Sequence, residues 1–91
     1  MKFVMLGNYS LKGLKGASAR RTGKVNDIVA KAGGRLDSIF ALLGDYDLVI
    51  TADFPSVPVA MKASIDISKL TGISFRSLPA VPVDEFDRLI K

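Results

Sequence analysis

The sequence predicts an α+β domain of the ferredoxin-like class, with the element order β-α-β-β-α-β and a short C-terminal helix. Three observations predict it: four segments rich in strand-forming residues, two longer segments with a helical apolar period, and an acidic turn between the second and third strands. A chain of 91 residues, 48% hydrophobic, can build one modest core. We therefore expect a single domain over residues 1–91 and a four-stranded antiparallel sheet.

The first half of the chain is expected to hold a strand, a helix and the beginning of a hairpin. Residues 2–9 form an apolar run that ends at Gly-Asn, which is typical of a buried strand leaving into a loop. The glycines of residues 10–16 argue against a continuous helix there. A helix is expected over 17–32, ended by Gly33-Gly34, because four apolar residues repeat on one face: Val25, Ile28, Val29 and Ala32.

The second half is expected to begin with an antiparallel hairpin. Residues 35–43 and 46–54 are rich in strand formers and flank the polar pair Gly44-Asp45. Pro55 stops the second of these strands, and Ser56 is placed to cap the next helix.

That next helix is expected over 57–71, with Gly72 just past its end. Its apolar period runs through Ala60, Ala63, Ile67 and Leu70. A fourth strand over 73–81 and a helix in the tail 82–91 complete the order, the tail being acidic at its start and basic at its end as the helix dipole favours.

Alternation in segment 46–54 predicts that the two faces of the sheet differ. Successive side chains of a strand point to opposite faces. One set is apolar throughout and is assigned to the helices: Tyr46, Leu48, Ile50, Ala52 and Phe54. The other set is mixed, so it is expected to meet solvent, a ligand or a second subunit: Asp47, Val49, Thr51 and Asp53.

The chain resembles the GYD domain family over nearly its whole length. The residues that carry the resemblance are "GNYS" and "KG" near the start, "GG" before the second strand, "LGDYDLVITADFP" and the closing "VDEF". The name of the family refers to a Gly-x-Tyr-Asp feature, matched by Gly44, Tyr46 and Asp47. The resemblance implies a ferredoxin-like fold of the dimeric α/β barrel type, hence a homodimer or higher homo-oligomer, and it implies no defined activity for the family as a whole.

Composition excludes most common catalytic and metal centres. The chain has no His and no Cys, so it cannot form a Ser-His-Asp triad, a Cys-His pair, a His-ligated haem or a Cys/His zinc site. Three carboxylates near the turn, Asp45, Asp47 and Asp53, spread over roughly 27 Å of extended chain, too far apart for one cation site. No cofactor and no metal are expected.

Two interpretations of the turn remain open. In one, a small polar or carboxylate-bearing ligand binds in a pocket whose candidate contacts are Tyr9, Tyr46, Asp47, Thr51 and Arg76. In the other, the turn is structural, with Gly44 at a positive φ and Asp47 accepting backbone hydrogen bonds. The function favoured is a GYD-type homo-oligomer binding such a ligand between subunits, and the alternative is a cofactor-independent oxygenase or isomerase with a carboxylate/Tyr/Arg pocket.

The net charge of +4 is concentrated in residues 12–35, which carry seven basic residues against Asp27. A nucleic-acid-binding module is a second alternative, but a solvated helix face is favoured because no aromatic residue is interleaved for base stacking. The basic loop could also cover a pocket mouth. No apolar stretch approaches the roughly 20 residues that cross a bilayer, and the absence of cysteine fits the cytoplasm, so a cytoplasmic protein with no membrane partner is expected.

Overall fold

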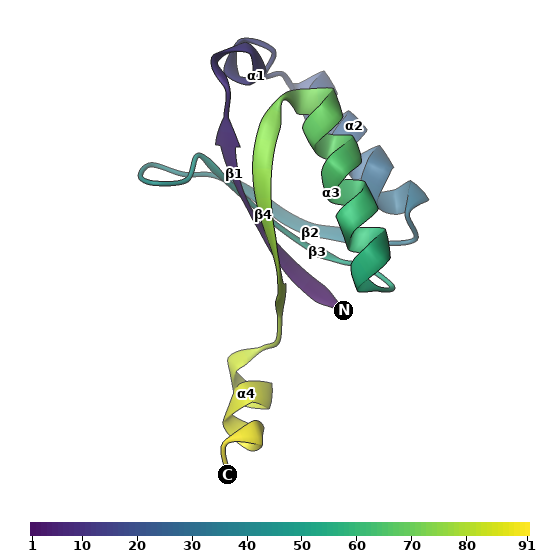
Figure 1. Cartoon of the computed structure of the whole chain (residues 1–91), viewed down its shortest axis with the longest axis vertical. Helices are drawn as coiled ribbons and strands as arrows, with labels where there is room; N and C mark the ends of the chain where they lie inside the picture. The colour runs from purple at the N-terminus through teal and green to yellow at the C-terminus, as the bar shows by residue number, and fades with distance from the viewer.

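The computed structural model describes all 91 residues as a four-stranded antiparallel sheet with four helices (Figure 1). The strands are β1 (Lys2–Tyr9), β2 (Arg35–Ala41), β3 (Leu48–Asp53) and β4 (Ile73–Ala80). The helices are α1 (Leu11–Lys15), α2 (Ala19–Lys31), α3 (Val57–Thr71) and α4 (Val83–Leu89). The strand order is β2-β3-β1-β4, so the predicted α+β, ferredoxin-like class is confirmed.

Both long helices lie on one face of the sheet. Helix α2 packs against β2, α3 packs against β4, and the two helices contact each other. Figure 1 shows α4 standing clear of this two-layer body, beyond the end of β4. No element of the chain covers the opposite side of the sheet, which we call the open face. None of the helices has the length and apolar character needed to cross a membrane.

The core forms where the two central strands face the helices. Alternate residues of β1 and β3 are buried, among them Met5 and Ile50, each about 1% exposed. Phe3 and Phe54 meet edge to face, with ring centroids 5.8 Å apart. Helix α2 contributes Val29, which is fully buried. The predicted inward set of the third strand is confirmed from Leu48 to Phe54.

Serine side chains begin three of the helices. The hydroxyl groups of Ser10, Ser18 and Ser56 accept hydrogen bonds from backbone N–H groups in the first turns of α1, α2 and α3. The predicted cap at Ser56 is confirmed, and so is the end of α3 at Gly72, whose φ of 71° is left-handed. Because Ser18 is a cap, α2 begins two residues later than predicted, and the short helix α1 occupies part of the glycine-rich segment.

The hairpin is looser than the predicted two-residue turn. Strand β2 ends earlier than expected, and strand β3 begins later than expected. Residues 42–47 therefore form the connection between them. Tyr46 lies in this connection and is half-buried, so its predicted place on the core face of the third strand is wrong. Asp47 also lies outside β3, although its backbone is hydrogen-bonded on both sides. Its N–H donates to the Gly7 carbonyl, and its carbonyl accepts from the N–H of Leu42. Gly44 has a positive φ of 141°, as predicted.

One position of the α3 core face was predicted wrongly. Leu70 is 38% exposed, whereas Thr71 is buried in its place. The Thr71 hydroxyl donates to the Ile67 carbonyl and accepts the N–H of Ile73, so its polar atom is satisfied. This polar residue therefore joins the end of α3 to the start of β4.

Strand β2 contains an irregularity that reverses its inside-outside pattern. Leu36 pairs with Ala52 and Ser38 pairs with Thr51, so Asp37 has no partner residue on β3. Such an extra residue is a β-bulge. It directs Ile39 toward the core and Phe40 toward the open face.

Truncation of a buried residue of α3 is expected to cost far more stability than truncation of an exposed one. Ile67→Ala removes a side chain that is 0% exposed and is expected to lower the free energy of unfolding by about 3 kcal/mol. Met61→Ala, on the outer side of the same helix and 59% exposed, should change it by less than about 0.5 kcal/mol. Urea titration followed by circular dichroism measures both, and equal losses would contradict the core assignment.

Candidate functional site on the open face of the sheet

The open face presents an apolar centre with polar groups at its ends. The outward residues of β1 and β4 pair as Val4 with Leu78 and Leu6 with Arg76. On the other side of β1, Val49 of β3 lies next to Leu6, and Phe40 of β2 lies next to Val49. Phe40 is 61% exposed and Leu78 is 49% exposed. A large part of this apolar surface therefore has no cover within the chain.

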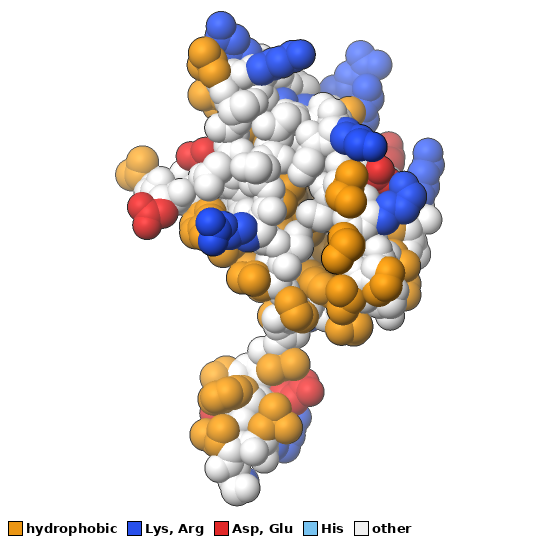
Figure 2. All heavy atoms as spheres, viewed as in Figure 1, with side chains coloured by type: hydrophobic (Ala, Val, Ile, Leu, Met, Phe, Trp, Pro, Cys, Tyr) orange, Lys and Arg blue, Asp and Glu red, His pale blue; other side chains and the backbone are white.

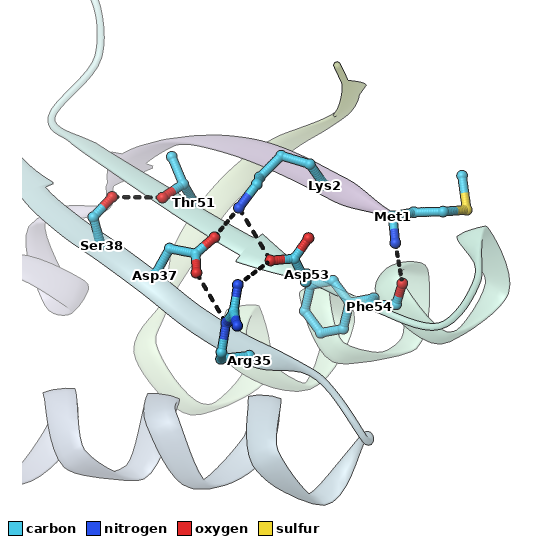
Figure 3. A network of polar contacts seen from close by, with 8 residues as sticks. All are labelled: Met1, Lys2, Arg35, Asp37, Ser38, Thr51, Asp53 and Phe54. Carbon is cyan, nitrogen blue, oxygen red and sulfur yellow. Dashed lines mark hydrogen bonds and ion pairs between the residues drawn. The ribbon is translucent and has the colours of Figure 1, made fainter. Parts of the chain in front are cut away.

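At one end of the open face, four charged side chains form a closed network (Figure 3). Lys2 donates to Asp37 and, at 3.0 Å, to Asp53. Arg35 reaches the same two carboxylates, each at 3.2 Å. The network ties β1, β3 and β2 together, and the bulge at Asp37 places its carboxylate within reach of β1.

The network shifts the pKa values of two of its members. Hydrogen bonds to Asp37 and then to Asp53 raise the pKa of Lys2 above 10.5. The hydrogen bond from Lys2 lowers the pKa of Asp37 below 3.8, with a further contribution from Arg35. The network consists of two basic and two acidic side chains, so it has no formal net charge with which to attract an ionic ligand.

A hydroxyl pair extends the polar end of the face toward its centre. Ser38 and Thr51 lie opposite each other on β2 and β3, with their oxygen atoms 2.5 Å apart. Cross-strand hydroxyl pairs of this kind stabilise a sheet. Thr51, one of the predicted ligand contacts, is therefore already hydrogen-bonded within the chain.

Asp47 performs the structural role that the turn chemistry allowed. Its carboxylate accepts a hydrogen bond of 2.9 Å from the backbone N–H of Tyr9, 38 residues away in sequence. Together with the bonds of its own backbone, this contact fastens the hairpin connection to the end of β1. Tyr46 lies beside it in the same connection, and neither residue is part of β3.

Tyr9 is on the helix side of the sheet. It packs against the core, and the guanidinium group of Arg21 lies 5.7 Å from the centre of its ring. Arg21 also donates to the Gly13 carbonyl at 2.5 Å, and more weakly to that of Thr71. One member of the basic segment is therefore used to hold α1 and the end of α3.

Arg76 is the predicted contact that remains free. It is exposed on the open face and has no ion pair or hydrogen bond within the chain. Of the five predicted residues, Arg76 and Thr51 share this face, on strands separated by β1. Tyr9, Tyr46 and Asp47 form a separate group around the hairpin connection, so the five residues do not make one pocket.

Sequence reasoning missed three members of the charge network, Lys2, Arg35 and Asp37. It also missed Ser38, the hydroxyl partner of Thr51. Lys2 is the first residue of β1 and Asp53 is the last residue of β3, and a strand was predicted at each place. The pairing of these two residues would have followed from the register of the two strands. Asp37 could not be placed in this way, because its direction depends on the bulge.

These features define a small ferredoxin-like α+β domain with helices on one side of the sheet and a bare, partly apolar face on the other. The sequence profile of the GYD domain family matches residues 3–90, and the chain belongs to this family. Comparison with curated proteins finds no match.

The contribution of the charge network to stability is expected to depend on pH at both extremes. Because the pKa of Asp37 is lowered on folding, its contribution is present above pH 3.8 and is lost as the pH falls through the folded value. Because the pKa of Lys2 is raised, its contribution is present below pH 10.5 and is lost as the pH rises through the folded value.

Thermal unfolding of the wild type and Asp37→Asn measures this contribution. The difference in melting temperature should be constant between these limits, shrink on either side and decrease in 1 M salt. Asp45→Asn, at a residue without polar contacts, is the control. A difference that does not vary from pH 3 to pH 11 would contradict the assignment.

Substitution of Asp47 is expected to destabilise the fold. Asp47→Ala leaves the Tyr9 N–H without its acceptor and should cost about 1–2 kcal/mol. Asp47→Asn keeps an acceptor oxygen and should cost less. Urea unfolding at pH 7 measures both against Asp45→Ala, and an Asp47→Ala variant as stable as that control would show that the contact does not stabilise the fold.

Proposed function

We propose that this GYD-domain protein is a ligand-binding homodimer in which two open faces meet and enclose a small carboxylate-bearing molecule held by Arg76. The observation that carries the proposal is the open face itself, an uncovered apolar surface that includes one charged side chain without a partner. Phe40 and Leu78 are exposed on this face, and Arg76 lies two residues before Leu78 along β4.

The exposed area of the chain supports association. The accessible surface is 6086 Å², whereas a compact monomer of 9.8 kDa exposes about 5,200 Å². The excess of roughly 900 Å² is similar to what one partner buries in an interface of standard size. Burial of the apolar centre of the open face would remove part of this excess.

The arrangement of charge on the open face suits a paired sheet. The network of Lys2, Arg35, Asp37 and Asp53 is neutral and lies at one end, where it can remain in contact with water. Val4 and Leu78 lie between this network and the cross-strand row that Arg76 shares with three hydrophobic residues: Leu6, Val49 and Phe40. Two such faces can bury their apolar centres without burying a net charge from the network.

Arg76 determines which class of ligand the enclosed space would bind. A guanidinium group forms two parallel hydrogen bonds with a carboxylate, and these are stronger where water is excluded. An Arg buried without a counter-ion would be costly, so pairing of the faces creates a demand for an anionic group beside it. No cofactor is part of this proposal.

The other two candidate functions have less support. An oxygenase or isomerase would use Asp47 and Tyr46, but the Asp47 carboxylate is occupied by a backbone N–H in the hairpin connection. A nucleic-acid-binding surface would use the basic residues of α1 and α2, of which Arg21 is engaged inside the chain. A cytoplasmic location belongs to the proposal. The chain has no cysteine, so it forms no disulfide bonds and does not require an oxidising compartment to fold.

Sedimentation at micromolar concentration tests the association. We expect the wild type to have the mass of at least two chains, and Phe40→Lys to lower that mass by placing a charge on the open face. Met61→Lys is the matched control, because Met61 is equally exposed but lies on α3, in the other layer. A monomeric wild type, or equal effects of the two variants, would overturn the proposal.

A thermal-shift screen of small carboxylates on the wild-type protein tests the binding of a ligand. A carboxylate present at 100 times its dissociation constant should stabilise the wild type by about 2.7 kcal/mol and should not stabilise Arg76→Gln to the same degree.

A further inference from the structure

Helix α4 is amphipathic and has no partner in the chain. Figure 2 shows its hydrophobic side chains gathered on a body that is separate from the rest of the molecule. No residue of α4 is buried. Its apolar residues fall on one side of the helix and are 51% to 72% exposed: Val83, Phe86, Leu89 and, at the cap, Ile90. A helix this short is not stable in water without packing.

Carboxylates border the apolar side of α4 on both edges. At 3.6 residues per turn, Glu85 lies next to Leu89 on one edge and Asp87 lies next to Val83 on the other. Asp84 lies on the far side of the helix. The surface that α4 presents is therefore an apolar strip between two negative charges.

The helix layer of the same chain contains a groove with the complementary pattern. It lies between α2 and α3, has a volume of about 510 Å³ and has apolar walls that include Ile28 and Val59. Lys31 of α2 stands at one side and Lys62 of α3 at the other. Lys62 is paired with Asp66 at 2.8 Å, whereas Lys31 has no partner in the chain.

The dimensions of the helix and the groove agree. Along α3 the groove runs from Pro58 to Asp66, about 12 Å at 1.5 Å per residue. The seven residues of α4 are about 10 Å long by the same measure. A hydrophobic strip flanked by carboxylates thus matches the groove in length and in its apolar walls. Asp66 also lines the groove and pairs with Lys62, so Lys31 supplies the unpaired positive charge for a carboxylate of α4.

Helix α4 cannot enter the groove of its own chain. Only Val81 and Pro82 link β4 to α4, a connection of at most about 10 Å. Helix α3 packs on β4, so it stands between this link and the groove, and a helix is itself about 10 Å across. The occupant must therefore come from another molecule.

We propose that α4 of one chain docks in the α2–α3 groove of a second copy, with its carboxylates beside Lys31 and Lys62. This contact goes beyond the pairing of open faces and uses none of their residues. The groove is on the opposite side of the sheet from the open face, so both contacts can form at once. Together they generate assemblies of more than two chains.

Disulfide trapping in the full-length chain tests the contact, because the protein has no cysteine of its own. Chains carrying Lys31→Cys are mixed under mild oxidation with chains carrying Glu85→Cys or Asp87→Cys, and mixed dimers are identified by mass. At least one of these two pairs should form at least ten times faster than the pair of Lys31→Cys with the control Asp84→Cys, whose side chain points away. Equal rates, or no mixed dimer, would overturn the proposal.

Two further variants separate this contact from the pairing of open faces. Crosslinking is expected to persist when Phe40→Lys is added to both chains, and to fall at least tenfold when Phe86→Ser is added to the chain that donates α4. Lys31→Glu should reduce the mass of the wild-type assembly, and Glu85→Lys with Asp87→Lys in the same chain should restore it. A Phe86→Ser variant that crosslinks as fast as its parent would overturn the docking of α4.

Discussion

A sheet has two faces, and this chain has long helices for only one of them. Helices α2 and α3 both lie on the same side, where Phe3, Met5, Ile50 and their neighbours form the core. The remaining side is left to strands alone. The position of the core, the partly polar composition of the open face and the proposed pairing of two chains all rest on this one imbalance.

Polar residues at the two ends of the molecule have different roles, because only one face of the sheet is covered by helices. Lys2 and Asp37 join three strands at one end of the bare side, where an ionic network keeps its contact with water. Asp47 and Arg21 act at the other end of the molecule, where each satisfies backbone groups that close the fold. Arg76 has neither role. Arg76 is thus the one charged side chain on the open face that has no hydrogen bond or ion pair within the chain. It is also the side chain on this face best suited to bind a ligand.

Sequence periodicity was a good guide wherever a single face had to be buried. The spacing of Ala60, Ala63 and Ile67 identified the buried side of α3. The ends of the helix were located by Ser56 and Gly72, which cap it. Periodicity was a poor guide where backbone hydrogen bonds, rather than the side-chain pattern, determined the position of a residue. The position of Asp47 depends on hydrogen bonds to β1, and no alternation within its own segment encodes a partner 38 residues away. The candidate site was accordingly predicted as one cluster but lies in two places.

The bulge in β2 has an effect that extends beyond the network it serves. Because it adds one residue to the strand, every side chain after it changes sides: Ile39 enters the core and Phe40 leaves it. A strand of the same sequence without the bulge would show the mirror of this pattern, with the aromatic ring under the helices and a smaller aliphatic group outside. The bulge takes up Asp37, so that Leu36 and Ser38 pair with the consecutive residues Ala52 and Thr51. The chemical character of the exposed sheet is therefore set by the register of β2 as well as by its composition.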